Sequence, residues 1–187
     1  MDLNTVITAM GVMGGLGGFS FGLYQYYRTQ RLRSAEFAAN EVSRWLDTRE
    51  TRQVISMLEW LERDVALETA EGSNRFENVM VKNEELPQAL APHTERNLSP
   101  KETAIRGVFD RFLFGLQRIE HFIESGVVKQ RDVEPFLRYY LELIGKKPSV
   151  RMPEASQTAL WKYIEFYDLR DVKKLFARFG YGNEPRT

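Results

Sequence analysis

The first 27 residues differ from the rest of the chain in their pattern of apolar and polar positions. No charged residue occurs from Leu3 to Tyr27, a run of 25 positions. A helix rises about 1.5 Å per residue, so roughly 20 apolar residues cross a bilayer core of about 30 Å. The run therefore predicts a transmembrane anchor over residues 1–27.

Glycine is concentrated in the middle of this run, where six of the twelve residues from Gly11 to Gly22 are glycine. Residues four apart lie on one face of a helix, which groups Gly11 with Gly15, and Gly14 with Gly18 and Gly22. A face without side chains lets a second helix approach closely in a membrane. The predicted helix-packing residues are Gly11, Gly14, Gly15, Gly18 and Gly22.

A phosphate-binding loop is the alternative interpretation of these glycines. Such a loop needs a strand before it, a helix after it and, in the P-loop form, a lysine after the last glycine. No lysine lies near the glycines, and Ser20 takes the third glycine position of a dinucleotide pattern that starts at Gly15 and Gly17. Only fourteen residues precede Gly15. The pattern therefore disfavours a nucleotide site, and no cofactor is predicted.

Aromatic and basic residues after the run indicate an orientation. Three tyrosines occupy the level of an interfacial aromatic belt, and three arginines follow, whereas no lysine or arginine precedes the run. Basic residues stay in the cytoplasm and attract anionic headgroups, so we expect the N-terminus outside a bacterial inner membrane. The predicted membrane-interface residues are Tyr24, Tyr26, Tyr27, Arg28, Arg31 and Arg33.

Apolar residues recur at helical spacing in most of the remaining chain. The first helix is expected to continue to about Leu46, and a second helix to run from about Thr51 to Leu67. Residues 70–99 lack a steady period and predict an irregular connection with one short helical turn from Glu84 to Leu90. No segment alternates in the manner of a strand, so no sheet is predicted.

Local signals delimit the C-terminal helices. Pro100 and Glu102 follow Ser99 in the spacing of a capping box with proline at the first helical position. The predicted N-caps are Ser99, Asp132 and Asp168. The predicted helix ends are Gly126, Gly145 and Gly180.

These patterns predict an all-α fold in which one transmembrane helix continues into a compact cytoplasmic bundle. The expected organisation has an anchor (1–27), a juxtamembrane and second helix (28–69) and an irregular connection (70–99). The C-terminal helical part of the same domain (100–180) and a tail (181–187) follow.

Composition narrows the classes of function. Lysine plus arginine and aspartate plus glutamate number 26 each, and this balance does not indicate a nucleic-acid partner. The absence of cysteine excludes disulfides, thiol nucleophiles and thiolate metal sites. The two histidines, His93 and His121, lack the Glu-x-x-His pairs of a di-metal bundle and the arginine spacing of an all-helical RNase. We therefore predict no metal site, no catalytic residue and no enzyme.

Two stretches, FDRFLFGLQRIEHFIESG and LWKYIEFYDLRDVKKLFARFG, resemble an uncharacterised bacterial family when taken together with the N-terminal anchor. Its members join one N-terminal membrane helix to a small helical domain of unknown function. The resemblance covers most of the chain and implies a bacterial inner-membrane protein, but it carries no catalytic motif.

The sequence favours a membrane-anchored interaction module, either an adaptor or an accessory subunit of a membrane complex. The expected partners are membrane lipid and another transmembrane helix, from this chain or from another protein. The alternative is self-assembly through the glycine face into a homo-oligomer, such as a pore-forming or defence effector. An enzyme with no recognisable motif is the third hypothesis.

Overall fold

The computed structural model describes residues 2–68, 73, 75–145 and 152–181, with the side chains of residues 3–17 outside the description. The described chain is mostly helical, as predicted, and it also contains a two-stranded sheet. The elements in chain order are α1 (Leu3–Asp47), α2 (Arg49–Glu59), β1 (Glu62–Glu68), β2 (Phe76–Lys82), η1 (Asn83–Glu85), α3 (Leu86–Ala89), α4 (Pro100–Glu124), α5 (Gln130–Gly145), α6 (Glu154–Phe166) and α7 (Arg170–Arg178).

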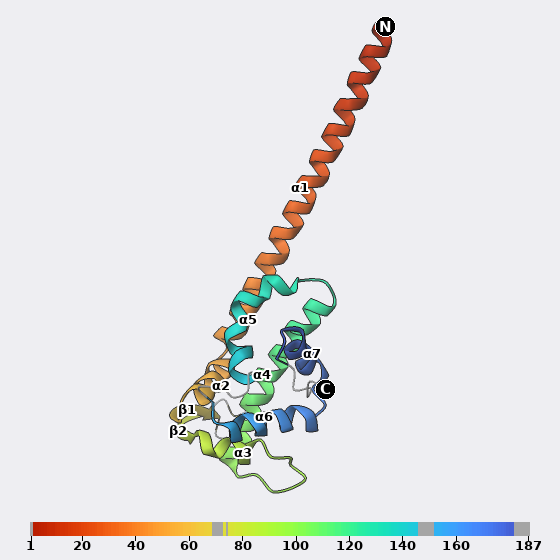
Figure 1. Ribbon diagram of the computed structural model, residues 1–187. Helices are drawn as coiled ribbons and strands as arrows, with labels where there is room; N and C mark the ends of the chain where they lie inside the picture. The colour runs from red at the N-terminus through yellow and green to blue at the C-terminus, as the bar shows by residue number, and fades with distance from the viewer. Residues whose placement is uncertain (1, 69–72, 74, 146–151, 182–187) are drawn as a thin grey trace, which may run out of the picture.

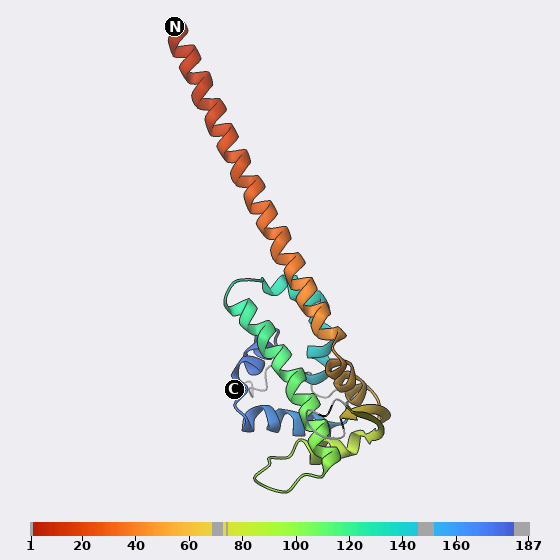
Figure 2. The same cartoon turned by 180° about the vertical axis from the view of Figure 1, so that it is seen from behind.

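Helix α1 projects from a globular body formed by the other elements (Figures 1 and 2). Its continuation to Asp47 agrees with the expected end near Leu46. Ser34 Oγ donates to the carbonyl of Val127 at 3.0 Å, and Ala38, Val42 and Trp45 are buried farther along the helix. Among the described side chains of α1, those that pack on the body therefore lie in its C-terminal part.

A β-hairpin replaces the second half of the predicted second helix. Helix α2 ends at Glu59, and β1 pairs antiparallel with β2 from Glu62 opposite Lys82 to Glu68 opposite Phe76. The prediction failed because the apolar spacing that includes Leu61 imitates a helix, whereas Leu61 is 73% exposed. The predicted irregular connection was also wrong where it contains β2.

The short helical turn expected from Glu84 to Leu90 is present as η1 followed by α3. Asn83 leads into this turn and is buried. Its side-chain Nδ2 donates to the carbonyl oxygen of Met57 at 3.0 Å. Its backbone N–H donates to the carbonyl oxygen of Leu61 at 2.7 Å. These bonds attach the end of the hairpin to α2.

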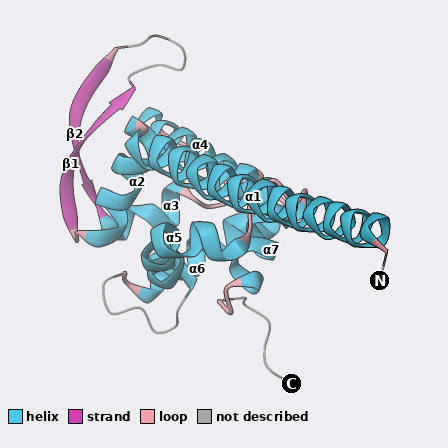
Figure 3. Ribbon diagram, turned by 90° about the horizontal axis from the view of Figure 1, so that it is seen from above, coloured by secondary structure: helices cyan, strands magenta, loops and turns pink. Residues whose placement is uncertain are grey.

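Helix α4 forms the centre of the body, and α1, α2 and α7 pack around it (Figures 1 and 3). Phe109, Phe112, Leu113 and Leu116 of this helix are almost completely buried. Their spacing of three and four residues places them on one apolar stripe. This stripe belongs to one apolar core, to which the other elements of the body also contribute buried side chains.

The capping box before α4 is confirmed. Ser99 Oγ accepts from the N–H of Glu102 at 3.3 Å, and the Glu102 carboxylate accepts from the N–H of Ser99 at 2.7 Å. The predicted glycine ends are also found, since Gly126 and Gly180 have φ of +73° and +80°, and α5 ends at Gly145. Such positive φ values favour glycine.

The other two predicted N-caps are wrong. Asp132 lies in the first turn of α5, which already begins at Gln130. Leu169 is the N-cap of α7, and Asp168 adopts φ of +46° with its carboxylate bound by Arg170 and Lys173. Asp168 therefore stabilises the turn between α6 and α7 by ion pairs.

The localisation predicted from the N-terminal run is contradicted. Within the described residues, no helix combines the length and the apolar character that a membrane crossing requires. The described side chains of α1 begin at Gly18, and charged residues recur from Arg28 onward. This part of the helix is therefore too polar over the required length for the predicted single-pass inner-membrane anchor.

Candidate functional site

The predicted packing glycines all lie in α1. Positions Gly11, Gly14 and Gly15 belong to the stretch whose side-chain environment is not described. A Cβ added at Gly18 or Gly22 meets no atom within 4 Å. The structure therefore leaves open space beside both described glycines.

The predicted interface residues occupy the same projecting part of α1. All sixteen side chains from Gly18 to Arg33 are exposed, and we call this stretch the exposed α1 segment. It includes the three tyrosines Tyr24, Tyr26 and Tyr27 and the three arginines Arg28, Arg31 and Arg33. The contacts found there are internal to the helix. The rings of Tyr26 and Tyr27 meet edge to face at 5.9 Å, and Gln30 donates to the Tyr26 hydroxyl at 3.3 Å.

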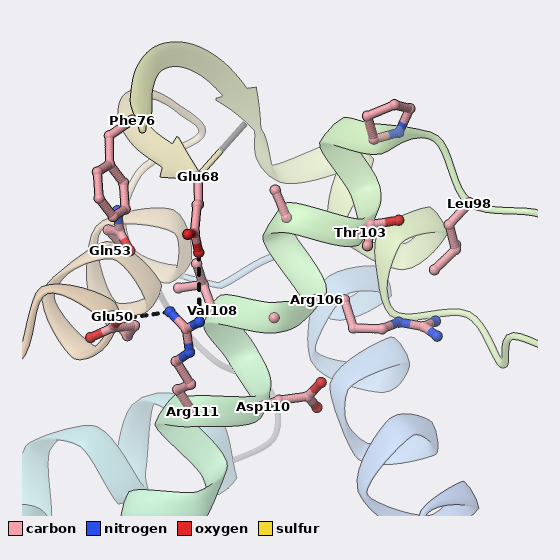
Figure 4. Close-up of a pocket in the computed structure, with 13 residues that line it drawn as sticks. Glu50, Gln53, Glu68, Phe76, Leu98, Thr103, Arg106, Val108, Asp110 and Arg111 are labelled. Atoms are coloured by element: carbon pink, nitrogen blue, oxygen red, sulfur yellow. Dashed lines mark hydrogen bonds and ion pairs between the residues drawn. The ribbon is translucent and has the colours of Figure 1, made fainter. Parts of the chain in front are cut away.

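A second feature is a cavity of about 600 Å³ along the outer side of α4, which we call the α4 cavity (Figure 4). Helix α2 contributes Glu50 and Gln53, and the hairpin contributes Glu68 and Phe76. The α4 cavity has space beside Gly107, because a Cβ added there meets no atom within 4 Å.

Arg111 of α4 joins the two acidic side chains on one wall of the α4 cavity. Its Nη1 lies 2.9 Å from Glu50 Oε1, and its Nη2 lies 3.6 Å from Glu68 Oε2 (Figure 4). The arginine is about half exposed, so these ion pairs are screened by water and contribute modestly to stability. They position α2 and the hairpin on α4.

Arg106 lies on the other wall of the α4 cavity and is 9% exposed. Its Nε donates to the carbonyl of Ala89 at 3.2 Å, its Nη1 to the hydroxyl of Tyr167 at 3.3 Å, and its Nη2 to the carbonyl of Ala91. The Tyr167 hydroxyl also bonds to His93 Nδ1 at 2.7 Å. Arg106 thus connects α4 to α6 and to the segment after α3.

The carboxylate of Asp110 completes this wall by accepting a hydrogen bond from the Tyr163 hydroxyl. Burial raises the pKa of Tyr163 far above its ordinary value, and the hydrogen bond to Asp110 acts in the same direction. Tyr163 therefore stays protonated and acts as a donor at neutral pH.

The polar side chains around the α4 cavity are bound to other groups of the chain. Glu50, Glu68 and Asp110 each have a partner, and the Thr103 hydroxyl donates to the carbonyl of Ser99 at 3.0 Å. No group of three metal-ligating side chains occurs within the part of the chain that the structure describes.

Sequence reasoning missed the α4 cavity because its walls come from separate segments. Arg111 and Glu50 are 61 positions apart, and Tyr163 and Asp110 are 53 apart. No local spacing signals such pairs. Gly107 is a glycine within a strongly predicted helix, but so is Gly115, which does not line the cavity.

Neither a protein-family model, nor a curated protein, nor a solved structure matches this chain. The exposed α1 segment and the α4 cavity are therefore the observations on which a function can be based.

Proposed function

We propose that this chain is a helical interaction module that pairs with a second copy of itself through α1. The observation that supports the proposal most strongly is the exposure of large apolar side chains on the part of α1 that projects from the globular body. These side chains are Phe19, Phe21, Leu23, Tyr24, Tyr26, Tyr27 and Leu32. Contiguous apolar surface of this kind is typical of interaction sites.

An isolated helix is also a costly element to maintain in water. Most helical stability in proteins comes from packing an apolar face rather than from intrinsic propensity. The exposed α1 segment is about 24 Å long at 1.5 Å per residue, and it contains two glycines that lower its propensity. Packing against another helix would supply the stabilisation that the body does not provide.

The arrangement of side chains around the segment favours pairing with an identical helix. At about 100° per residue, Gly18, Gly22 and Thr29 share one face with Gln25, and Phe21 and Tyr26 flank this face on opposite sides. A face with two glycines between aromatic ridges is self-complementary under two-fold symmetry. Two copies can thus approach closely at the glycines and bury the flanking rings.

The native mass of the full chain in mild detergent tests this proposal. We expect a dimer for the wild type and a monomer for the variant Gly18→Leu/Gly22→Leu. Because a Cβ at either glycine meets no atom within 4 Å, leucine does not disturb the single chain. Ser20→Leu is the matched control, since Ser20 lies about 200° around the helix from Gly18, and it should remain dimeric.

A monomeric wild type would contradict self-pairing, and the module would then be expected to present α1 to a helix of another protein, as an adaptor does. A dimer that survives both leucines would keep self-pairing but contradict the role of the glycine face. Thermal unfolding of each variant checks that the body remains folded.

A further inference from the structure

Three arginines line a groove of about 300 Å³ between α2 and β1, and we call it the arginine groove. Arg49 and Arg52 come from α2, and Arg63 comes from β1, which lies beside α2 (Figure 3). Within the described residues, none of the three guanidinium groups has a carboxylate at ion-pair distance. This differs from the α4 cavity, where Arg111 joins two glutamates.

Neighbouring groups hold these arginines without neutralising them. The guanidinium carbon of Arg49 lies 3.9 Å from the centre of the Phe76 ring, and that of Arg63 lies 5.1 Å from the Trp60 ring. Stacking uses the face of a guanidinium and leaves its N–H donors at the edge available. Arg52 Nη2 donates a hydrogen bond to the carbonyl of Asp47 at 2.9 Å.

The charge of the groove is strongly positive. Asp64 is the one carboxylate among the residues that line it, against three guanidinium groups. The Ser56 hydroxyl, which also lines the groove, adds a neutral donor. Guanidinium groups bind phosphate through paired N–H donors, and such charge-assisted bonds are stronger than neutral ones. A dianion with several acceptor oxygens matches this set of donors.

We propose that the arginine groove binds a phosphate monoester group, carried either by a small molecule or by a phosphorylated side chain. The groove is at the small end of the range of ligand pockets, about 300–1,000 Å³, so it accommodates the phosphoryl group and little of its carrier. The three arginines supply the charge, and Arg49 and Arg63 are oriented in advance by their aromatic neighbours.

Calorimetric titration of the full chain with inorganic phosphate at constant ionic strength tests the shared chemistry. We expect saturable binding that Arg52→Gln and Arg63→Gln each weaken by about tenfold or more. Arg44→Gln is the matched control, because it removes an exposed arginine on α1 that already pairs with Glu41, and it should bind as the wild type does.

Fluorescence provides a second readout in the same titration. Trp60 is 54% exposed, whereas Trp45 and Trp161 are buried, so a dianion bound to Arg63 beside the Trp60 ring should change the emission of Trp60. The Trp60→Phe variant identifies the signal. Circular dichroism of each arginine variant confirms that lost binding does not reflect lost folding.

Two further titrations distinguish the carriers. Glucose 6-phosphate represents small molecules, and a short phosphoserine peptide represents modified proteins. Whichever ligand binds more tightly than inorganic phosphate identifies the carrier, and equal affinities would mean that the groove recognises the phosphoryl group alone. Absence of saturable binding by phosphate and by both esters would overturn the proposal, as would binding that both glutamine variants retain.

Discussion

The carboxylate of Glu120 in α4 is fully buried and is bound by the guanidinium of Arg178 in α7. Arg178 Nε lies 3.0 Å from Glu120 Oε2 and 3.2 Å from Oε1, and Nη2 donates to Oε1 as well. The arginine side chain is one-third exposed, whereas that of the glutamate has no exposed surface. This buried charge pair attaches the last helix of the body to the central helix, and a second, exposed pair joins Lys174 of α7 to Glu124 of α4 at 2.9 Å.

Removal of Arg178 should destabilise the body strongly. Arg178→Met leaves a buried carboxylate without a partner, which typically costs about 3 kcal/mol of unfolding free energy. The double variant Arg178→Met/Glu120→Leu removes both charges and should recover most of the loss. Urea unfolding measures both effects. The two single variants, Arg178→Met and Glu120→Leu, provide the comparison. If their losses of unfolding free energy simply add in the double variant, the two side chains are not coupled in the way that the structure indicates.

Two glycines of α4 should respond in opposite ways to alanine. A Cβ at Gly115 would lie 2.1 Å from both Cδ1 and Nε1 of Trp45, so Gly115→Ala displaces the ring that attaches α1 and should cost about 1–3 kcal/mol. At Gly107 a Cβ meets no atom within 4 Å. Gly107→Ala should therefore stabilise the chain by up to about 1 kcal/mol through helix propensity.

Thermal unfolding of the two single variants compares the same substitution in the same helix. A destabilised Gly107→Ala together with an unchanged Gly115→Ala would contradict this assignment of the two environments.

Acidification should weaken the start of α4. The backbone N–H of Ser99 donates to Glu102 and holds the pKa of that carboxyl below its ordinary value, which is about 4.3 in unfolded chains. The contribution of Glu102 to the unfolding free energy is therefore fully present at pH values above its pKa in the unfolded chain. It is lost as the pH falls through its pKa in the folded chain. Glu102→Gln should lower the unfolding free energy at pH 7 by about 1 kcal/mol. It should also make the decline of unfolding free energy with falling pH shallower below about pH 5.

Urea midpoints measured over a series of acidic pH values check the expected effect of Glu102. Glu95→Gln is a suitable control, because Glu95 is an exposed carboxylate of the segment before α4. A decline of the same steepness in Glu102→Gln and in the wild type would show that other carboxylates cause it.

Alkaline pH should act through Tyr163. Burial, followed by the hydrogen bond to Asp110, raises the folded pKa of Tyr163, so its contribution is complete below the unfolded pKa of about 10 and declines as the pH rises above it. Tyr163→Phe should make the alkaline decline in unfolding free energy shallower and cost about 1 kcal/mol at neutral pH. Unfolding curves over the alkaline range provide the measurement, and an unchanged slope would argue against this role.

Much of the helical structure could be predicted because its determinants lie close together in the chain. The capping box joins Ser99 to Glu102 across three positions, and Gly126 and Gly180 end helices through their own backbone angles. The hairpin could not be predicted in this way. Its register pairs Glu62 with Lys82, and β1, in which Val65 and Leu67 are buried, packs on the distant α4 as well as on the neighbouring α2.

The candidate sites also differ in how far the sequence could predict them. The sequence pointed to Gly18 and Gly22, since spacing along one helix is enough to put them on one face. It did not point to the α4 cavity or the arginine groove, whose residues come from different elements. Arg49 lay between the two predicted helices, whereas Arg52 and Arg63 both fell in the predicted second helix, which does not extend to Arg63 in the structure.

The sequence by itself determined that this protein is mostly helical and where several of its helices begin and end, because helix periodicity and capping act over three or four residues. Only the tertiary structure decided that residues 62–82 contain a hairpin, that Glu120 is buried against Arg178, and that three arginines meet without a carboxylate partner among the described residues. Those features depend on contacts between segments far apart in the chain, whose free energy exists only once the body has assembled.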